Sequence, residues 1–317
     1  MPPHDKAVKI AASPINWHND DFPILGADTA VDTILREIKR AGFDGTELGS
    51  VFPSDPRQLT DILRRHDLEL AAGWFSTFLL SRNVEWEYER FRRYCDFLAK
   101  AGGKHINTAE CTRCPFKKVD DDPYTQHFSA VAKPLFPRSV PRPTDKEWDT
   151  IARGMIEFDR IAHEYGLTLG YHPHIQTAVE NTADLDELAR RVERLSEDRA
   201  ALPITLDTGH LALAGDDPLD PLTRYIKQIK HLHVKNIRPS AVKKVHAEKT
   251  GFQFGIIEGI FTVPGDGGLD FEPIFKILRE NDYQGWLVVE AEQNPDTANP
   301  YLHAKLAREY IKAVAGW

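Results

Sequence analysis

The chain contains 317 residues, which exceeds the usual size of one domain, about 100–200 residues, but suits one large α/β barrel. Hydrophobic residues make up 41% and charged residues 28% of the chain, so it can bury a substantial core and is not a disordered protein. The formal net charge of −8 is spread along the chain without long blocks of one sign, which argues against a nucleic-acid partner.

The sequence lacks the signals of a membrane or secreted protein. No window approaches the roughly 18 consecutive apolar residues of a membrane span, and the N-terminus has no secretory pattern. An odd number of cysteines, Cys95, Cys111 and Cys114, fits a reducing compartment, so we expect a cytoplasmic protein that contacts no membrane. Cys111-x-x-Cys114 has zinc or redox spacing, but no second pair exists to complete a structural zinc site. We interpret the two residues as ordinary loop thiols, with metal binding as the alternative.

Short apolar or β-branched runs alternate eight times with longer amphipathic stretches. The pattern predicts strands at Lys9–Asn16, Gly45–Gly49, Glu69–Phe75, His105–Glu110, Thr168–His174, Pro203–Thr208, His231–Ile237 and Trp286–Glu292. It predicts helices near Thr29–Ala41, Pro56–Arg65, Glu85–Ala101, Asp145–Tyr165, Thr182–Leu195, Pro218–Lys230, Phe271–Asn281 and Pro300–Ala315. Eight such units favour a single (β/α)8 barrel over a doubly wound sheet. No dinucleotide or P-loop glycine motif is present, which argues against a nucleotide cofactor.

We expect residues 1–317 to form one barrel domain with two long loops. The first, at about 111–144, follows the fourth strand, and the second, at about 238–270, follows the seventh. Both leave the C-terminal ends of strands, which is the face where barrel enzymes place their active sites.

Ionisable and aromatic residues stand at nearly every predicted strand end. Taken singly, each is explained as a solvated loop residue or as a core histidine with its hydrogen bonds made. A barrel, however, would bring all of them together at the C-terminal end of its strands. They are Glu47, Trp74, Glu110, His172, His174, Asp207, His210, His233, Lys235 and Glu290. Imidazole and carboxylate together are ligands of divalent transition metals such as Mn²⁺, Co²⁺, Fe²⁺ or Zn²⁺. Side chains alternate between the two faces of a strand, so His172 and His174 share one face, as do His231, His233 and Lys235, and likewise Glu290 and Glu292. Alternation therefore does not decide which member of each set reaches the metal.

The strand-end pattern Asp207-x-x-His210, His233-x-Lys235 and Glu290 resembles the xylose isomerase-like barrel superfamily of sugar isomerases, epimerases and dehydratases. The resemblance implies a divalent metal, with Mn²⁺ or Co²⁺ as the first expectation. The implied ligands are His172, Asp207, His233 and Glu290. Strand five departs from the superfamily pattern, because GYHPH replaces a sequence like LEPH, so Glu110 or another loop is the alternative to His172.

Longer stretches resemble the branch of the superfamily that dehydrates keto-inositols. They include Ser13–Asp21, Thr144–Asp149, Tyr171–His174, Leu206–His210, Phe261–Gly267 and Val288–Gln293. This resemblance implies removal of water from a cyclic ketose such as 2-keto-myo-inositol through an enediolate. Histidine suits the proton transfers, for which we select His174 and His210, and Lys235 would stabilise the developing oxyanion. The expected substrate contacts are Glu47, Trp74, Glu110 and Arg238.

Other functions remain open at this point. An isomerase or epimerase on the same scaffold shares the proton abstraction but expels no water. A non-catalytic carbohydrate-binding barrel would need neither the metal nor the proton-transfer groups. An endonuclease of the same superfamily is disfavoured by the charge of −8. The expected partner is a small polyol or ketose, and a homo-oligomer is expected by analogy alone.

Overall fold

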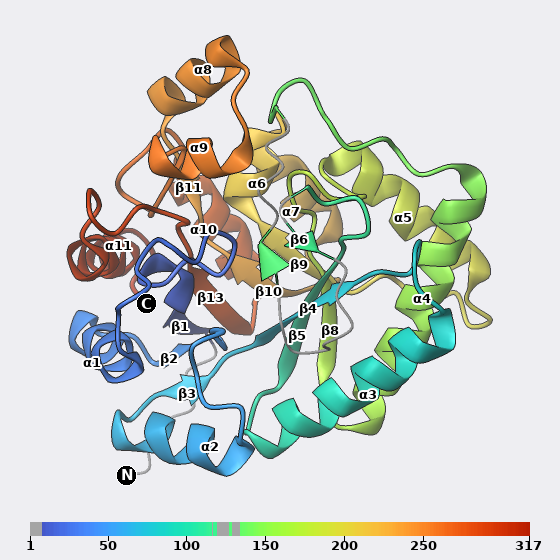
Figure 1. Ribbon diagram of the computed structural model, residues 1–317, viewed down its shortest axis with the longest axis horizontal. Helices are drawn as coiled ribbons and strands as arrows, with labels where there is room; N and C mark the ends of the chain where they lie inside the picture. The colour runs from blue at the N-terminus through green and yellow to red at the C-terminus, as the bar shows by residue number, and fades with distance from the viewer. Residues whose placement is uncertain (1–7, 116, 119–126, 129–133) are drawn as a thin grey trace.

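The computed structural model describes residues 8–115, 117–118, 127–128 and 134–317 (Figure 1). A single parallel sheet runs in the order β3-β2-β1-β13-β10-β9-β8-β5-β4. Its strands are β1 (Val8–Ala12), β2 (Gly45–Thr46), β3 (Glu69–Leu70), β4 (Gly73–Thr77), β5 (His105–Glu110), β8 (Thr168–Tyr171), β9 (Ile204–Asp207), β10 (Ile229–His233) and β13 (Gly285–Val289).

The sheet closes on itself because β3 and β4 belong to one extended run. β3 pairs with β2, while β4 pairs with β5 on the other side. Between them, Ala71 N donates to Thr46 O and Leu48 N donates to Ala72 O, so pairing with the second strand continues across the gap. The eight expected strands therefore form a closed parallel barrel, which confirms the predicted (β/α)8 fold.

Helices surround the barrel and cover it with their apolar faces (Figure 1). They are α1 (Val31–Ala41), α2 (Pro56–Arg65), α3 (Val84–Lys100), α4 (Asp145–Glu164), α5 (Thr182–Leu195), α7 (Leu219–Tyr225), α10 (Glu272–Glu280) and α11 (Pro300–Ala315). Local sequence fixes several helix ends. Thr144 and Glu147 form a capping box at the start of α4, and Gly42 ends α1 with a φ of 94°.

Additional elements follow the C-terminal ends of the strands. η1 (Pro14–Asn16) follows β1, and α6 (Thr208–Leu213) begins directly after β9. The predicted loop at 238–270 contains α8 (Pro239–Glu248), α9 (Phe252–Ile257) and β12 (Phe261–Thr262), which pairs with β11 (Asn236–Ile237). The expected seventh strand is thus shorter than predicted, because the chain leaves the barrel after His233 to form this second pairing.

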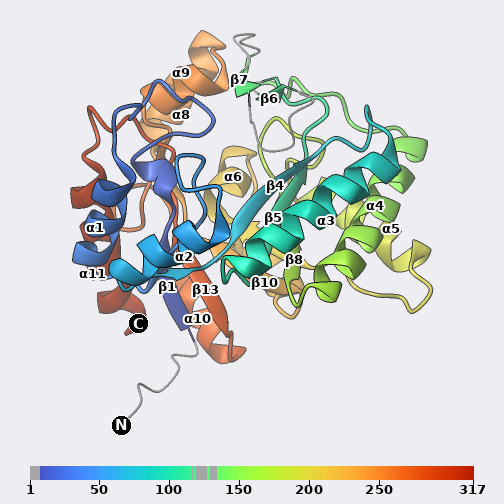
Figure 2. The same ribbon diagram turned by 60° about the horizontal axis from the view of Figure 1, so that its bottom comes forward.

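The loop predicted at 111–144 lies partly outside the described residues. Its described part includes the antiparallel pair β6 (Lys117–Lys118) and β7 (His127–Phe128). Figure 2 places this pair at the same end of the barrel as α8 and α9. Within the described part of the chain, no helix is both long enough and apolar enough to span a bilayer.

The interior of the barrel is unusually polar. His105, Asn107, Thr205 and His231 are all buried there, where parallel barrels more often place branched aliphatic side chains. Strand register brings these residues to matching levels, because His231 pairs with Thr205, and His233 pairs with Asp207 one layer nearer the C-terminal ends. Hydrogen bonds must therefore replace much of the hydration that these groups lose on folding.

Candidate active site

Four side chains from neighbouring strands meet at the C-terminal end of the barrel. His233 Nδ1 lies 3.4 Å from Asp207 Oδ2 and 3.2 Å from Glu290 Oε2. His172 Nε2 lies 3.2 Å from the same nitrogen of His233 and 3.5 Å from Asp207 Oδ2. The structure thus brings together the four residues that were expected to bind a metal.

The end of β9 determines how Asp207 faces this cluster. Asp207 is the N-cap of α6, and its Oδ1 accepts hydrogen bonds from the backbone N–H groups of Gly209 and His210, at 2.8 and 2.9 Å. Its other oxygen, Oδ2, is buried and has no hydrogen-bond partner. A buried carboxylate oxygen that faces two imidazoles and a second carboxylate fits a cation, and the nitrogen and oxygen donors suit a divalent transition metal. Asp207, His233 and Glu290 form one group that could hold such an ion.

Lys235 lies beneath the carboxylates, and its side chain is completely buried. Its Nζ is 2.5 Å from Glu290 Oε1, 2.9 Å from Glu292 Oε1 and 3.4 Å from Asp207 Oδ2. Burial opposes the charge of this ammonium group, but the three carboxylates outweigh burial and raise the pKa of Lys235 well above its usual range. Burial likewise acts to raise the pKa of Asp207, yet Lys235 and the histidines hold it well below its usual range.

His174 and His210 lie next to the cluster, with ring centroids 3.8 Å apart. His174 Nδ1 is 2.8 Å from the carbonyl oxygen of Ile175. His210 Nε2 is 2.9 Å from Lys235 Nζ and 3.4 Å from Glu292 Oε1. Burial, together with the neighbouring His174 and Lys235, holds the pKa of His210 well below its usual range.

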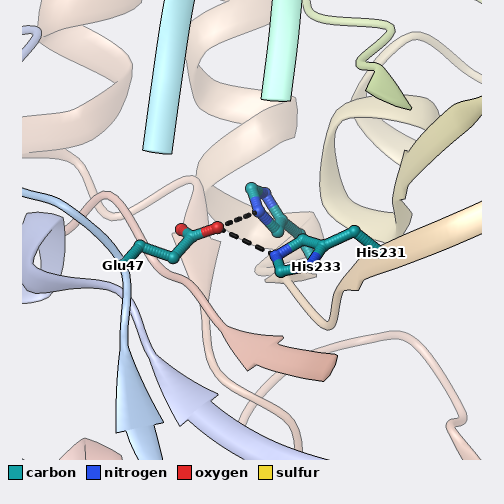
Figure 3. Close-up of side chains that lie close together, drawn as sticks. All are labelled: Glu47, His231 and His233. Atoms are coloured by element: carbon teal, nitrogen blue, oxygen red, sulfur yellow. Dashed lines mark hydrogen bonds and ion pairs between the residues drawn. The ribbon is translucent and has the colours of Figure 1, made fainter. Parts of the chain in front are cut away.

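Glu47 approaches the cluster from the second strand (Figure 3). Its Oε1 is 3.0 Å from Nε2 of both His231 and His233, and it also accepts a hydrogen bond of 2.8 Å from Asn107 Nδ2. Burial favours the protonated form of Glu47, but His233 and His231 reverse this effect and hold the pKa of the carboxyl group well below its usual range. Asn107 was not foreseen as part of this site, and His231 was noted only as an ionisable residue on the same strand face as His233, with no role assigned. Their signal in the sequence was a polar residue at an inward position of a buried strand.

A cavity of about 560 Å³, which includes its opening to solvent, lies above these groups. Its lining consists of Ser13, Pro14, Ile15, Asp20, Asp21, Glu47, Leu48, Trp74, Asn107, His172, His174, His233, Glu290 and Glu292. Trp74 forms one wall, because its ring meets His172 and His174 edge-on at 5.3 and 5.9 Å. Asp20 and Asp21 were not predicted, although they follow the first strand in the sequence and so share this end of the barrel.

Two predicted substrate contacts do not line this cavity. Glu110 turns away from it and accepts hydrogen bonds from Thr77, Leu79 N and Thr112 N at 2.8–3.0 Å. Burial raises the pKa of Glu110 to about 7, although these hydrogen bonds act in the opposite direction. Arg238 holds the loop after β10, where it donates to Gly259 O and Phe261 O and pairs with Asp266 at 2.7 Å. Both residues stabilise loops, and Glu110 does not take part in the ligand cluster.

The two cysteines of the C-x-x-C pair form no disulfide and lie in an apolar environment. Cys114 N donates to Cys111 O across a tight turn, and both side chains are buried in a cluster with Phe252 and Ile260. Neither belongs to a group of potential metal ligands among the described residues.

Eight parallel strands with buried imidazole and carboxylate groups at their C-terminal ends define a (β/α)8 barrel with a candidate metal centre. Residues 35–313 match the family described as the xylose isomerase-like TIM barrel. The chain is 39% identical over 312 residues to an inosose dehydratase of Clostridium botulinum (strain Alaska E43 / Type E3), and 97% of each chain is covered. The chain therefore belongs to the inosose dehydratase family of xylose isomerase-like TIM barrels.

Solved structures share the fold at lower sequence identity. The probable 3-DHS dehydratase AsbF of Bacillus anthracis superimposes with a TM-score of 0.66 at 16% identity, covering 96% of this chain and 98% of that chain. A protein named IOLI, solved with a bound zinc atom, has a TM-score of 0.64 at 15% identity, covering 97% of this chain and 98% of that chain.

Proposed function

We propose that this protein is a metal-dependent dehydratase that removes water from a keto-inositol such as 2-keto-myo-inositol. The observation that carries the proposal is the group of potential ligands Asp207, His233 and Glu290 beside a cavity, with His172 Nε2 3.2 Å from His233 Nδ1 and 3.5 Å from Asp207 Oδ2. Full-length identity of 39% to a relative named inosose dehydratase supports the choice of reaction and substrate class.

The four converging residues would hold the cation, and Mn²⁺ or Co²⁺ is the proposed ion. When bound, a divalent ion supplies a Lewis acid for the carbonyl oxygen of the substrate and its neighbouring hydroxyl. Lys235 keeps Glu290 and Asp207 ionised and in place. It is completely buried and does not line the cavity, so it would support the site by balancing the charge of these carboxylates rather than by contacting the developing oxyanion, as the sequence suggested.

Dehydration requires two proton transfers on the substrate. A base removes the proton from the carbon next to the carbonyl, and the C–H electron pair forms the enolate double bond. An acid then protonates the hydroxyl on the adjacent carbon. The enolate returns to the carbonyl form, its electron pair becomes the new C=C bond to that carbon, and the C–O bond breaks as water leaves. Of the two histidines predicted to transfer protons, His174 and His210, His174 is the better placed, because it lines the cavity. His210 lies next to it, with its ring tilted by 36° to that of His174 and its Nε2 2.9 Å from Lys235 Nζ, and so would contribute by holding both groups in position.

The substrate ring would bind between Trp74 and the carboxylates at the mouth of the cavity. Trp74 offers an apolar face to the C–H surface of the ring. Glu47, Asp20 and Asp21 line the same cavity and can accept hydrogen bonds from hydroxyl groups. These acceptors suit an uncharged polyol.

A product analysis tests the reaction type. Protein loaded with Mn²⁺ is incubated with 2-keto-myo-inositol, and the product is followed by mass spectrometry. The proposal predicts a product lighter by one water. An unchanged mass with altered ring configuration would instead identify an epimerase, and no turnover with any divalent metal would refute catalysis on this substrate.

A further inference from the structure

We infer that Glu47 is a positioning residue that fixes the tautomer of His233, and that a chain of hydrogen bonds through the barrel interior fixes Glu47 itself. This inference rests on the proposed metal site, since its purpose is to direct one nitrogen of His233 towards the cation. It assigns Glu47 a role beyond the substrate contact expected from the sequence.

The tautomer follows from the two neighbours of the His233 ring. Both ring nitrogens face a carboxylate, which accepts hydrogen bonds: Nε2 lies 3.0 Å from Glu47 Oε1, and Nδ1 lies 3.2 Å from Glu290 Oε2. A cation bound beside Nδ1 needs the lone pair of that nitrogen, so the hydrogen of the ligating imidazole lies on Nε2 and points to Glu47. Nδ1 faces Asp207 and Glu290, where the cation would bind. A carboxylate behind a metal-binding histidine sets its orientation and strengthens it as a ligand.

Three donors hold Glu47 Oε1 in this position. His231 Nε2 and His233 Nε2 approach from the same strand, β10 (Figure 3), and Asn107 Nδ2 donates from β5 at 2.8 Å. Because the amide nitrogen of Asn107 must face the carboxylate, its amide oxygen faces the opposite way, towards Thr205.

The chain of hydrogen bonds continues deeper into the barrel. Thr205 uses its single hydroxyl hydrogen to donate to Asn107 Oδ1 at 2.8 Å. His105 Nε2, 2.9 Å from the same hydroxyl oxygen, must therefore donate to it. Burial, assisted by the neighbouring His231, holds the pKa of His105 well below its usual range, so the ring is neutral and its Nδ1 accepts from Thr168 Oγ1 at 2.7 Å. Every link thus donates towards Glu47.

The backbone makes room for this chain at Gly170. A Cβ atom at Gly170 would lie 2.2 Å from Thr205 Oγ1 and 2.8 Å from His105 Nε2, so a side chain there would displace the contact between them. The His231 ring stacks on His105, with centroids 4.7 Å apart and an angle of 11° between the planes. A buried polar chain of this kind is often less favourable in free energy than an aliphatic interior, so its presence calls for a functional explanation. Holding the metal-binding tautomer of His233 provides that explanation.

Two substitutions interrupt the chain at different depths, and a third serves as the matched control. Glu47→Gln removes the charge that holds the His233 Nε2 hydrogen, and Thr205→Val removes one hydroxyl without changing the shape of the side chain. Glu37→Gln makes the same change in a carboxylate that accepts from a ring N–H, that of Trp17, but lies on α1 outside the barrel. Each metal-stripped protein is titrated with Mn²⁺ by calorimetry and with Co²⁺ by visible absorption, and thermal unfolding checks that it folds.

We expect Glu47→Gln to weaken Mn²⁺ binding by about 10- to 100-fold and to alter the Co²⁺ absorption bands, because the ligand nitrogen of His233 is no longer held. Thr205→Val should weaken binding less, in the same direction, and Glu37→Gln should bind like the unsubstituted protein. If both interior variants fold and bind both metals like the control, the chain is merely structural and the inference is wrong. If the unsubstituted protein itself binds no divalent metal, the proposed function fails, and the inference fails with it.

Discussion

The side chain of Lys235 lies directly across the backbone of Gly209. A Cβ atom at Gly209 would stand 2.5 Å from Lys235 Cγ and 2.8 Å from its Cβ, closer than such atoms approach in proteins. Gly209 lies two residues after Asp207, in the first turn of α6. In the sequence Asp-Thr-Gly-His, the N-cap Asp207 therefore holds its carboxylate at the site, and the lack of a side chain at Gly209 leaves room for Lys235.

Replacing this glycine should therefore damage the site through Lys235. We expect Gly209→Ala to lower the free energy of unfolding by about 1–3 kcal/mol, as overpacking does elsewhere, and to lower kcat as Lys235 shifts from Glu290. Gly102→Ala is a control for kcat: it should lose stability through backbone strain alone, because its φ is +89° and no atom lies within 4 Å of a Cβ there, and it should leave kcat unchanged. Urea unfolding and steady-state kinetics measure both effects. An alanine variant at residue 209 with unaltered kinetics would show that the position of Lys235 does not matter.

Removing the charge of Lys235 leaves three buried carboxylates without their counterion. We expect Lys235→Met to reduce the stability of the metal-stripped protein by about 3–5 kcal/mol, the usual result of breaking a buried ion pair. Since a divalent cation can replace part of the lost charge, Mn²⁺ should raise the Tm of this variant by more than it raises that of the unsubstituted protein. An equal rise in both proteins, measured by calorimetry, would contradict this electrostatic coupling.

The two histidines that follow β8, His172 and His174, should separate by function. His174→Gln should lower kcat by about 100- to 10,000-fold and leave Mn²⁺ affinity within a few-fold, as expected for a proton-transfer group. His172→Gln should instead weaken Mn²⁺ binding, because His172 Nε2 belongs to the converging donors. Kinetics and metal titration on both variants check the assignment. The reverse pattern would exchange the two roles.

The cysteines should be unreactive in the folded protein. All three thiols are buried, and burial raises the pKa of Cys95 to about 12. A thiol reagent at neutral pH should therefore react slowly with the native protein and rapidly with three thiols after unfolding. Rapid labelling of the native protein would contradict the buried placement.

The same burial predicts a pH dependence of the free energy of unfolding. The thiol of Cys95 ionises near its ordinary pKa in the unfolded state but stays protonated in the folded state, so the free energy of unfolding should fall as the pH rises from about 9 to about 12. Replacement of Cys95 by Ala should flatten this part of the plot of unfolding free energy against pH.

Sequence periodicity located the repeating units well. The fourth predicted strand, His105–Glu110, and the helices Pro56–Arg65, Thr182–Leu195 and Pro300–Ala315 coincide with the observed elements. Periodicity missed α6, because Thr208–Leu213 follows a strand without a loop and reads as its continuation. The signal was the N-cap Asp207, whose side chain closes the first turn of the helix.

The site was predicted less completely than the fold. Strand ends identify residues that share one end of a barrel, which is why His172, Asp207, His233 and Glu290 could be grouped. The direction in which each side chain turns depends on contacts that are remote in sequence. Glu110 binds the backbone of Leu79, and Glu47 binds His231 and Asn107, and neither contact can be read from local spacing.

Metal content and activity measured together test the central claim most directly. Metal-stripped protein is titrated with Mn²⁺, and the rate of water loss from 2-keto-myo-inositol is recorded alongside the amount of metal bound, with Asp207→Asn as the comparison. The account predicts that activity rises in proportion to bound metal up to one ion per chain, and that Asp207→Asn binds weakly and stays inactive. Full dehydratase activity in the stripped protein, or undiminished metal-dependent activity in Asp207→Asn, would contradict it.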